Sequence, residues 1–226
     1  MLKYFSLLQF HRKGNKNSLN LDTSAEHLEA AIEKKQRDLD HEIIQLQYCL
    51  IKIFEHCSKE LLQNEALCNY IDELAYESQR LLAHEHLWVR CNAAKLLALI
   101  LASYDFDLVA HNLLAVGERK STKLDFVYAN PEEDIKSLVL DLCAQMVPGD
   151  TAQIIIDEMM KIFLFIANML KDVPFSLKKQ EDEEETEEQA KVKTKINLNW
   201  LMRNIRFLAN KEVAKAPHCT TMVSKM

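Results

Sequence analysis

A long apolar segment between Glu85 and Ser103 restricts what this chain can fold into more than any other feature. Its apolar residues recur at spacings of three and four, which is the period of an α-helix, and they cover more than half of the helix circumference. We expect such a helix to be wedged between two layers of other elements. The residues that set the period are Val89, Ala93, Leu96, Leu97, Ile100 and Tyr104.

Arg90 lies inside this apolar arc, one turn into the predicted helix. Burying an unpaired charge there would be costly, so its donors need a carboxylate or free main-chain carbonyls as acceptors. We predict a structural ion pair between Arg90 and Glu85, or with an acid in the next pair of helices. A phosphate contact by Arg90 is the functional alternative, and the apolar surroundings favour the structural interpretation.

Helical segments come in pairs on both sides of this region. Residues 67–82 keep the helical period and are separated from the apolar helix only by Ala83 to Leu87. A second pair begins at Asn130-Pro131-Glu132-Glu133, which has the residues of a capping box and a proline at the first helical position. It breaks at Pro148-Gly149 and continues to about residue 172. The short connections predict antiparallel hairpins.

The remaining helices are less regular. A polar helix is predicted after Asp22-Thr23-Ser24 and should end near residue 37, before an amphipathic helix over 38–58. Asp105 can cap a short helix that reaches about Val116, and the charged stretch 118–123 is expected to loop out. A last helix starts near Asn197.

The composition fits an all-helical fold. The 226 residues include only three glycines and four prolines, and 48% are hydrophobic, so helix breakers are few and a sizeable core can form. The formal net charge of −6 gives no general attraction to nucleic acid or anionic lipid. The most apolar window, 154–170, contains three charged residues, and the N-terminus does not read as a signal peptide. We therefore expect a soluble intracellular protein that does not enter membranes.

No motif in the sequence points to catalysis. There is no glycine-rich phosphate loop, no Gly-x-Ser-x-Gly elbow and no His-Glu-x-x-His. The adjacent acids Asp72-Glu73 and Asp157-Glu158 are expected to face solvent rather than act as general acid and base. Six cysteines without a Cys-x-x-Cys pair predict reduced thiols and no metal site. We predict a protein that is not an enzyme, with no cofactor and no small-molecule substrate.

Two charged regions could contact partners. The run from Gln180 to Gln189 is strongly acidic and predicts a disordered, solvated insertion, with capture of a basic partner as the alternative. The last helix and the residues after it carry a basic set that could touch RNA or another partner, although a plain solvent face is the simpler interpretation. That set comprises Arg203, Arg206, Lys211 and Lys215, with Arg119, Lys120 and Lys123 as a further patch.

The pattern Val89-Arg90-x-x-Ala93-Ala94-x-x-Leu97 after a helix and a tight turn resembles a HEAT repeat, the hairpin unit of α-solenoids. A more specific resemblance is to the C-terminal region of the down-regulated-in-metastasis family, also called U-three small nucleolar RNA-associated protein twenty. It spans roughly residues 60–217 and rests on the order of several stretches. These are His86-Leu87-Trp88-Val89-Arg90, Asp134-Ile135-Lys136-Ser137-Leu138, the acidic insertion 181–188, Asn199-Trp200-Leu201 and Ala209-Asn210-Lys211-Glu212.

This resemblance implies a non-enzymatic scaffold of the small-subunit processome that acts in 18S rRNA maturation in the nucleolus. Its implied partners are other processome proteins, the U-three small nucleolar RNP and pre-rRNA. The chain departs from the family in being a small part of a very long solenoid and in ending before the family's last helices and lysine-rich tail. A generic HEAT or armadillo-like adaptor and an RNA-binding helical module are the alternatives.

Taken together, the sequence predicts an all-α fold, an α-solenoid of HEAT-like antiparallel helical hairpins with a disordered acidic insertion. We divide it into five parts. They are a poorly defined N-terminal segment (1–37), HEAT-like repeats (38–177), the charged insertion (178–196), a further repeat helix (197–216) and a tail (217–226).

Overall fold

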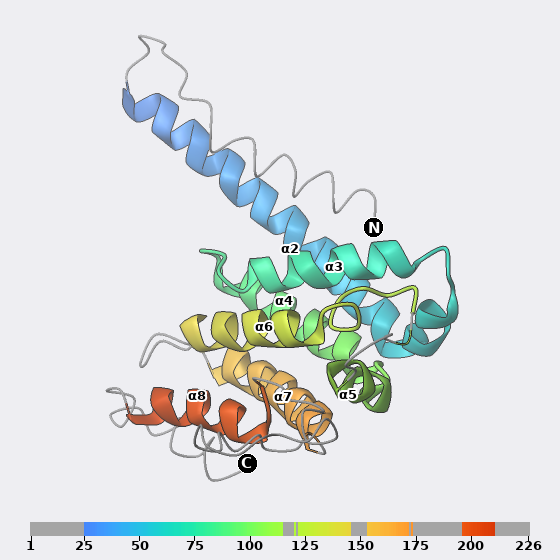
Figure 1. Cartoon of the computed structure of the whole chain (residues 1–226). Coiled ribbons are helices and arrows are strands. Elements are labelled where there is room, and N and C mark those ends of the chain that lie inside the picture. The colour runs from blue at the N-terminus through green and yellow to red at the C-terminus, as the bar shows by residue number, and fades with distance from the viewer. Residues whose placement is uncertain are drawn as a thin grey trace, which may run out of the picture.

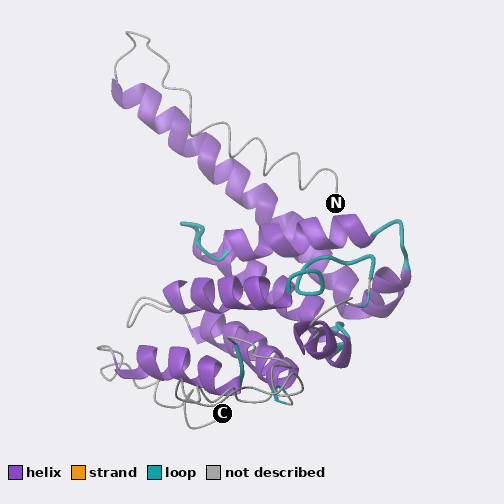
Figure 2. Ribbon diagram, in the orientation of Figure 1, coloured by secondary structure: helices purple, strands orange, loops and turns teal. Residues whose placement is uncertain are grey.

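The computed structural model describes residues 25–114, 120, 122–145, 153–171, 173 and 196–210, without the side chains of 25–30 and 206–210. Within these ranges the chain forms helices joined by loops, with no strand, so the described part is all-α (Figures 1 and 2). The helices are α2 (Ala25–Gln63), α3 (Cys68–Leu81), α4 (Leu87–Ala102), α5 (Phe106–Leu114), α6 (Pro131–Gln145), α7 (Gln153–Leu170) and α8 (Leu198–Asn210).

The longer helices lie in two layers (Figure 1). One layer contains α2, α4 and α7, and α4 packs between the other two. The second layer contains α3, α6 and α8, and the colour gradient shows that these three run in the same direction, opposite to α4 and α7 (Figure 1). Contacts between α3 and α4, and between α6, α7 and α8, join the layers. The short helix α5 packs against α6 and α7.

Helix α4 is the centre of the core, as its sequence predicts. It contacts α2 and α7 within its own layer and α3 in the other. Ala93 and Ala94 are both fully buried, and their small side chains let neighbouring helices approach closely. The other fully buried residues of α4 are Val89, Leu96, Leu97, Ile100 and Leu101.

The second predicted pair also forms. Helix α6 begins at Pro131, and the amide of Asp134 donates to the carbonyl of Asn130 over 3.0 Å. Helix α7 runs antiparallel to α6, and the turn between them lies outside the described residues (Figure 1). The α5 cap is confirmed as well, because Asp105 Oδ1 accepts from the amide of Leu108 at 3.1 Å.

Helix α2 differs from the prediction of two helices with a boundary near residue 37. The helix continues across that position and is kinked at Cys57 (φ −130°, ψ 21°), close to the predicted end at residue 58, before a further helical stretch reaches Gln63. The reason is that the residues around position 37 are good helix formers and include no glycine or proline. The first half of α2 projects away from the other helices, and residues 31–38 are exposed (Figure 1).

Candidate functional site: an exposed face and a buried clamp

The turn before α4 holds Arg90 through main-chain acceptors. Its Nη1 donates to the carbonyl oxygens of His84 at 2.8 Å and Glu85 at 3.1 Å. The contact with Glu85 therefore uses the carbonyl oxygen rather than the carboxylate that the sequence suggested. Free carbonyls in the tight turn lie within reach of the guanidinium, so they satisfy its donors and leave the Glu85 side chain exposed.

The predicted basic contact set is only partly placed. Arg203 lies on α8 and is exposed, while Leu201 and Ile205 of the same helix are buried. Arg206 lies on α8, but its side chain is outside the described residues, as are Lys211, Lys215 and the whole acidic run. The described residues therefore do not bring a basic RNA-contact set together around Arg203.

The exposed side of α2 and α4 carries two large aromatic residues. Tyr48 on α2 is 57% exposed and Trp88 on α4 is 53% exposed. The two helices meet there, since the Lys95 Nζ of α4 lies 2.7 Å from a Glu55 oxygen of α2. We call this surface the α2–α4 face, and it comprises Tyr48, Lys52, Glu55, Trp88, Asn92 and Lys95. A second cross-helix contact runs from Asn92 Nδ2 to the Ile44 carbonyl over 3.5 Å.

Two lysines share one carboxylate on the α2–α4 face. Lys52 lies 2.7 Å from Glu55 and also sits 5.5 Å from the centre of the Tyr48 ring. Hydrogen bonds from Lys52 and Lys95 lower the pKa of Glu55 from 4.5 to about 2. The hydrogen bond between Lys52 and Glu55 also raises the pKa of Lys52. With two cations and one anion, this face is locally positive in a chain whose net charge is −6.

Replacing Glu55 with glutamine removes the anion that Lys52 and Lys95 share, so the melting temperature at pH 7 is expected to fall. The decrease should be only roughly 1–3 °C, because ion pairs between solvent-exposed side chains are weak. The pKa of Glu55 is lowered on folding, so its contribution is present above pH 4.5 and is lost as the pH falls toward 2. Thermal melts of both proteins across this range measure the difference. Glu60→Gln on the same helix is the control, and an equal, pH-independent change in both variants would contradict the assignment.

A buried and a partly buried carboxylate clamp the loop before α6. Asp72 on α3 accepts from the amides of Asp125 at 2.8 Å and Phe126 at 3.1 Å, and Asp134 on α6 accepts from the amide of Val127 at 2.9 Å. Asp72 is therefore buried, and the expectation that the Asp72-Glu73 pair faces solvent is wrong for its first member. These acceptors hold the only positive φ of a non-glycine residue in the described chain, 67° at Val127.

A buried amide from α5 completes the clamp. Asn112 Nδ2 donates to the carbonyls of Lys120 at 3.0 Å and Tyr128 at 3.2 Å, and its Oδ1 accepts from the Lys120 amide at 2.9 Å. Burial raises the pKa of Asp72 and Asp134, and it raises the pKa of Tyr128 to about 12. Lys120, which belongs to the stretch that the sequence expected to loop out, is thus tied to α5, and the loop that follows is tied to α3 and α6.

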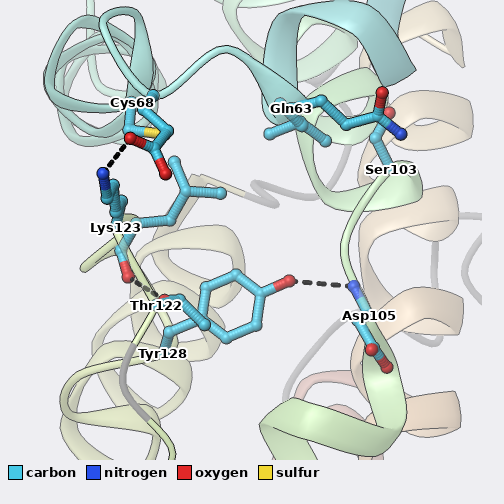
Figure 3. Close-up of a pocket in the computed structure, with 10 residues that line it drawn as sticks. Gln63, Cys68, Ser103, Asp105, Thr122, Lys123 and Tyr128 are labelled. Carbon is cyan, nitrogen blue, oxygen red and sulfur yellow. Dashed lines mark hydrogen bonds and ion pairs between the residues drawn. The ribbon is translucent and has the colours of Figure 1, made fainter.

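A pocket of about 330 Å³ lies where this loop meets the ends of α2 and α4 (Figure 3). Four of its lining residues pair with one another: Lys123 pairs with Glu65, and the Tyr128 hydroxyl accepts from the Asp105 amide at 2.8 Å. Burial raises the pKa of the Cys68 thiol, which disfavours the nucleophilic thiolate. The Cys68 thiol in this pocket is therefore not activated as a nucleophile.

Two further properties concern the described ranges only. No helix there is both long enough and apolar enough to cross a membrane. No three histidine, cysteine, aspartate or glutamate side chains gather there in a way that could hold a metal ion.

Comparisons of the chain with protein-family models, with curated proteins and with solved structures find no match. The family resemblance noted in the sequence therefore stays a prediction, and the function has to be inferred from the residues and their arrangement. The feature best suited to a function is the exposed aromatic and charged α2–α4 face, supported from behind by the buried core of α4.

Proposed function

We propose that this chain is a non-enzymatic scaffold, a segment of a HEAT-like α-solenoid that acts in the small-subunit processome during 18S rRNA maturation in the nucleolus. The observation that carries the scaffold proposal is the two-layer order of the helices. Helices α3, α6 and α8 form one layer with a common direction, and α2, α4 and α7 form the other. Such layering is the pattern expected of stacked hairpins.

The packing of α4 supports the solenoid proposal. Its partners are α3, with which it makes a hairpin, and α2 and α7, which lie on either side of it in the same layer. A helix of a single hairpin would need only one buried face, whereas the buried residues of α4 cover more than half of its circumference and leave one stripe with Trp88, Asn92 and Lys95 accessible. Side-by-side stacking of hairpins explains this burial, because each hairpin covers the apolar surface of the next.

The α2–α4 face is the surface we propose for partner binding. Tryptophan, tyrosine and arginine side chains contribute most to protein interfaces, and Trp88 and Tyr48 are both more than half exposed here. Asn92 and Lys95 are partly exposed, follow Trp88 by four and seven residues on the same side of α4, and supply polar groups. The specific partners, namely processome proteins and the U-three small nucleolar RNP, are proposed from the sequence resemblance around His86 to Arg90.

Affinity purification of the tagged chain from cells tests the proposal. We expect co-recovery of processome subunits, reduced at least several-fold by the double substitution of Tyr48 and Trp88 with alanine. Tyr70→Ala on α3, where the tyrosine is 36% exposed, is the matched control and should not reduce recovery. Recovery of unrelated complexes would reject the processome assignment and favour the generic HEAT or armadillo-like adaptor.

Direct RNA binding is the alternative that a second measurement separates. A filter-binding titration of the chain with pre-rRNA fragments at several salt concentrations should show weak binding that varies little with salt, because the described residues assemble no basic surface around Arg203. An RNA-binding module would instead lose affinity steeply as salt rises, since each neutralised phosphate releases a counterion.

A further inference from the structure

Two histidines close the turn between α3 and α4 with consecutive main-chain hydrogen bonds. The amide of His86 donates to Nδ1 of His84 over 3.1 Å, and the amide of Trp88 donates to Nδ1 of His86 over 3.3 Å. His86 is the N-cap of α4, with extended backbone angles of φ −76° and ψ 123°. The imidazole of His86 accepts the main-chain hydrogen bond that a serine, threonine, aspartate or asparagine side chain usually accepts at an N-cap.

Using an imidazole as a cap has a chemical consequence. The Nδ1 atom accepts a hydrogen bond only while it keeps its lone pair, and a protonated ring carries N–H on both nitrogens. Protonation of His84 or His86 would therefore set a ring N–H against a main-chain N–H. Lowering the pH therefore opposes these two amide contacts once a ring gains its second proton.

The charged groups around the turn determine which contact a protonated His84 gains. The Asp40 carboxylate of α2, nearly buried, lies 3.7 Å from Nε2 of His84. A protonated His84 gains attraction to Asp40 while it loses its role as acceptor for the His86 amide. The same Asp40 oxygen also accepts from Gln36 Nε2 at 2.9 Å. Other charges near the turn include the Arg90 guanidinium, held by the turn carbonyls, the exposed Glu85 carboxylate, and Arg80 of α3, which pairs with Glu77 at 2.7 Å. On α7, the Glu158 carboxylate acts on the nearby Cys91 thiol and pairs with Lys161 at 2.8 Å.

We propose that His84 and His86 form a pH-sensitive latch at the start of α4. With both rings neutral, the latch fixes the first turn, which includes the exposed Leu87 and Trp88. Protonation exchanges the amide contacts for the His84–Asp40 pair and loosens that turn. Because Trp88 belongs to the α2–α4 face, the latch controls how one aromatic residue of this face is presented. This inference depends only on the geometry of the turn and stands apart from the proposed function.

Amide NMR on the ¹⁵N-labelled full chain tests the latch. Between pH 8 and 5 we expect the main-chain resonances of His86 and Trp88 to shift with a sigmoidal pH dependence. The doubly substituted chain, His84→Asn with His86→Asn, should lose this dependence, because an asparagine oxygen accepts the same hydrogen bonds without titrating. At pH 5.5 the hydrogen-exchange protection of the Trp88 amide should be about fivefold lower in the native sequence than in the asparagine variant, the size of a lost N-cap.

A matched control uses His56, an exposed histidine elsewhere on α2. His56→Asn should leave the titration of the His86 and Trp88 amides unchanged, and thermal melts at pH 8 verify that each variant folds. Identical pH profiles for the native chain and the double asparagine variant would overturn the latch. So would loss of the titration in the His56 variant alone.

Discussion

Replacing Leu97 with alanine is expected to lower the free energy of unfolding by about 2–5 kcal/mol. Leu97 is fully buried in α4, the helix that contacts α2, α3 and α7 at once. Truncation there removes apolar contacts and leaves a cavity that the surrounding helices cannot close without moving. Urea unfolding followed by circular dichroism at 222 nm measures the change.

The matched control is the same substitution on an exposed face. Leu164 of α7 is 45% exposed, so Leu164→Ala should change the free energy of unfolding by less than about 0.5 kcal/mol. Similar losses in the two variants would mean that α4 is not the centre of the core. A cost at Leu97 below about 1 kcal/mol would have the same meaning, because full burial of a leucine cannot be reconciled with it.

Replacing Asp72 with alanine is the second change of large expected effect, at about 2–4 kcal/mol of unfolding free energy. The substitution removes the acceptor for two amides, at Asp125 and Phe126, and the second of these lies in the buried part of the loop. Unpaired buried donors are costly, and the strained backbone at Val127 loses a neighbouring restraint. Urea unfolding at pH 7 gives the difference.

Two variants make this prediction specific to hydrogen bonding. Glu73→Ala alters the adjacent exposed acid and should have little effect. Asp72→Asn retains one acceptor oxygen and should cost less than Asp72→Ala. Equal losses at positions 72 and 73 would show that the clamp does not hold the loop, and an asparagine variant as unstable as the alanine variant would show that charge matters more than the acceptor oxygens.

Sequence reasoning succeeded where the signal is local. The helical period of residues 85–103 and the start of α6 at Pro131 were both predictable, because spacing, capping and helix breakers act within a few residues. The burial of Val89 and Leu97 followed from the same period. The boundary expected near residue 37 was wrong because a change from polar to amphipathic sequence does not by itself stop a helix.

Sequence reasoning failed where the partners are distant along the chain. Asp72 is one of two adjacent acids on a helix and looked solvent-facing, but its amide partner Asp125 is 53 residues away. The burial of Glu158 was also missed, and here the partner is local, since Lys161 lies three residues along the same helix at 2.8 Å. The histidine cap of α4 was missed for another reason. Histidine is not among the residues that usually signal an N-cap, so its position alone carries little information.

The sequence by itself determined that the described chain is helical and where most of the helices begin and end, because those choices depend on side chains three and four residues apart. The tertiary structure alone decided that α4 lies between α2 and α7, that Asp72, Asn112 and Asp134 clamp one loop, and that the Glu55–Lys95 ion pair joins α2 to α4. These features depend on which apolar surfaces find each other across the chain, and a pattern within one helix does not specify its partner.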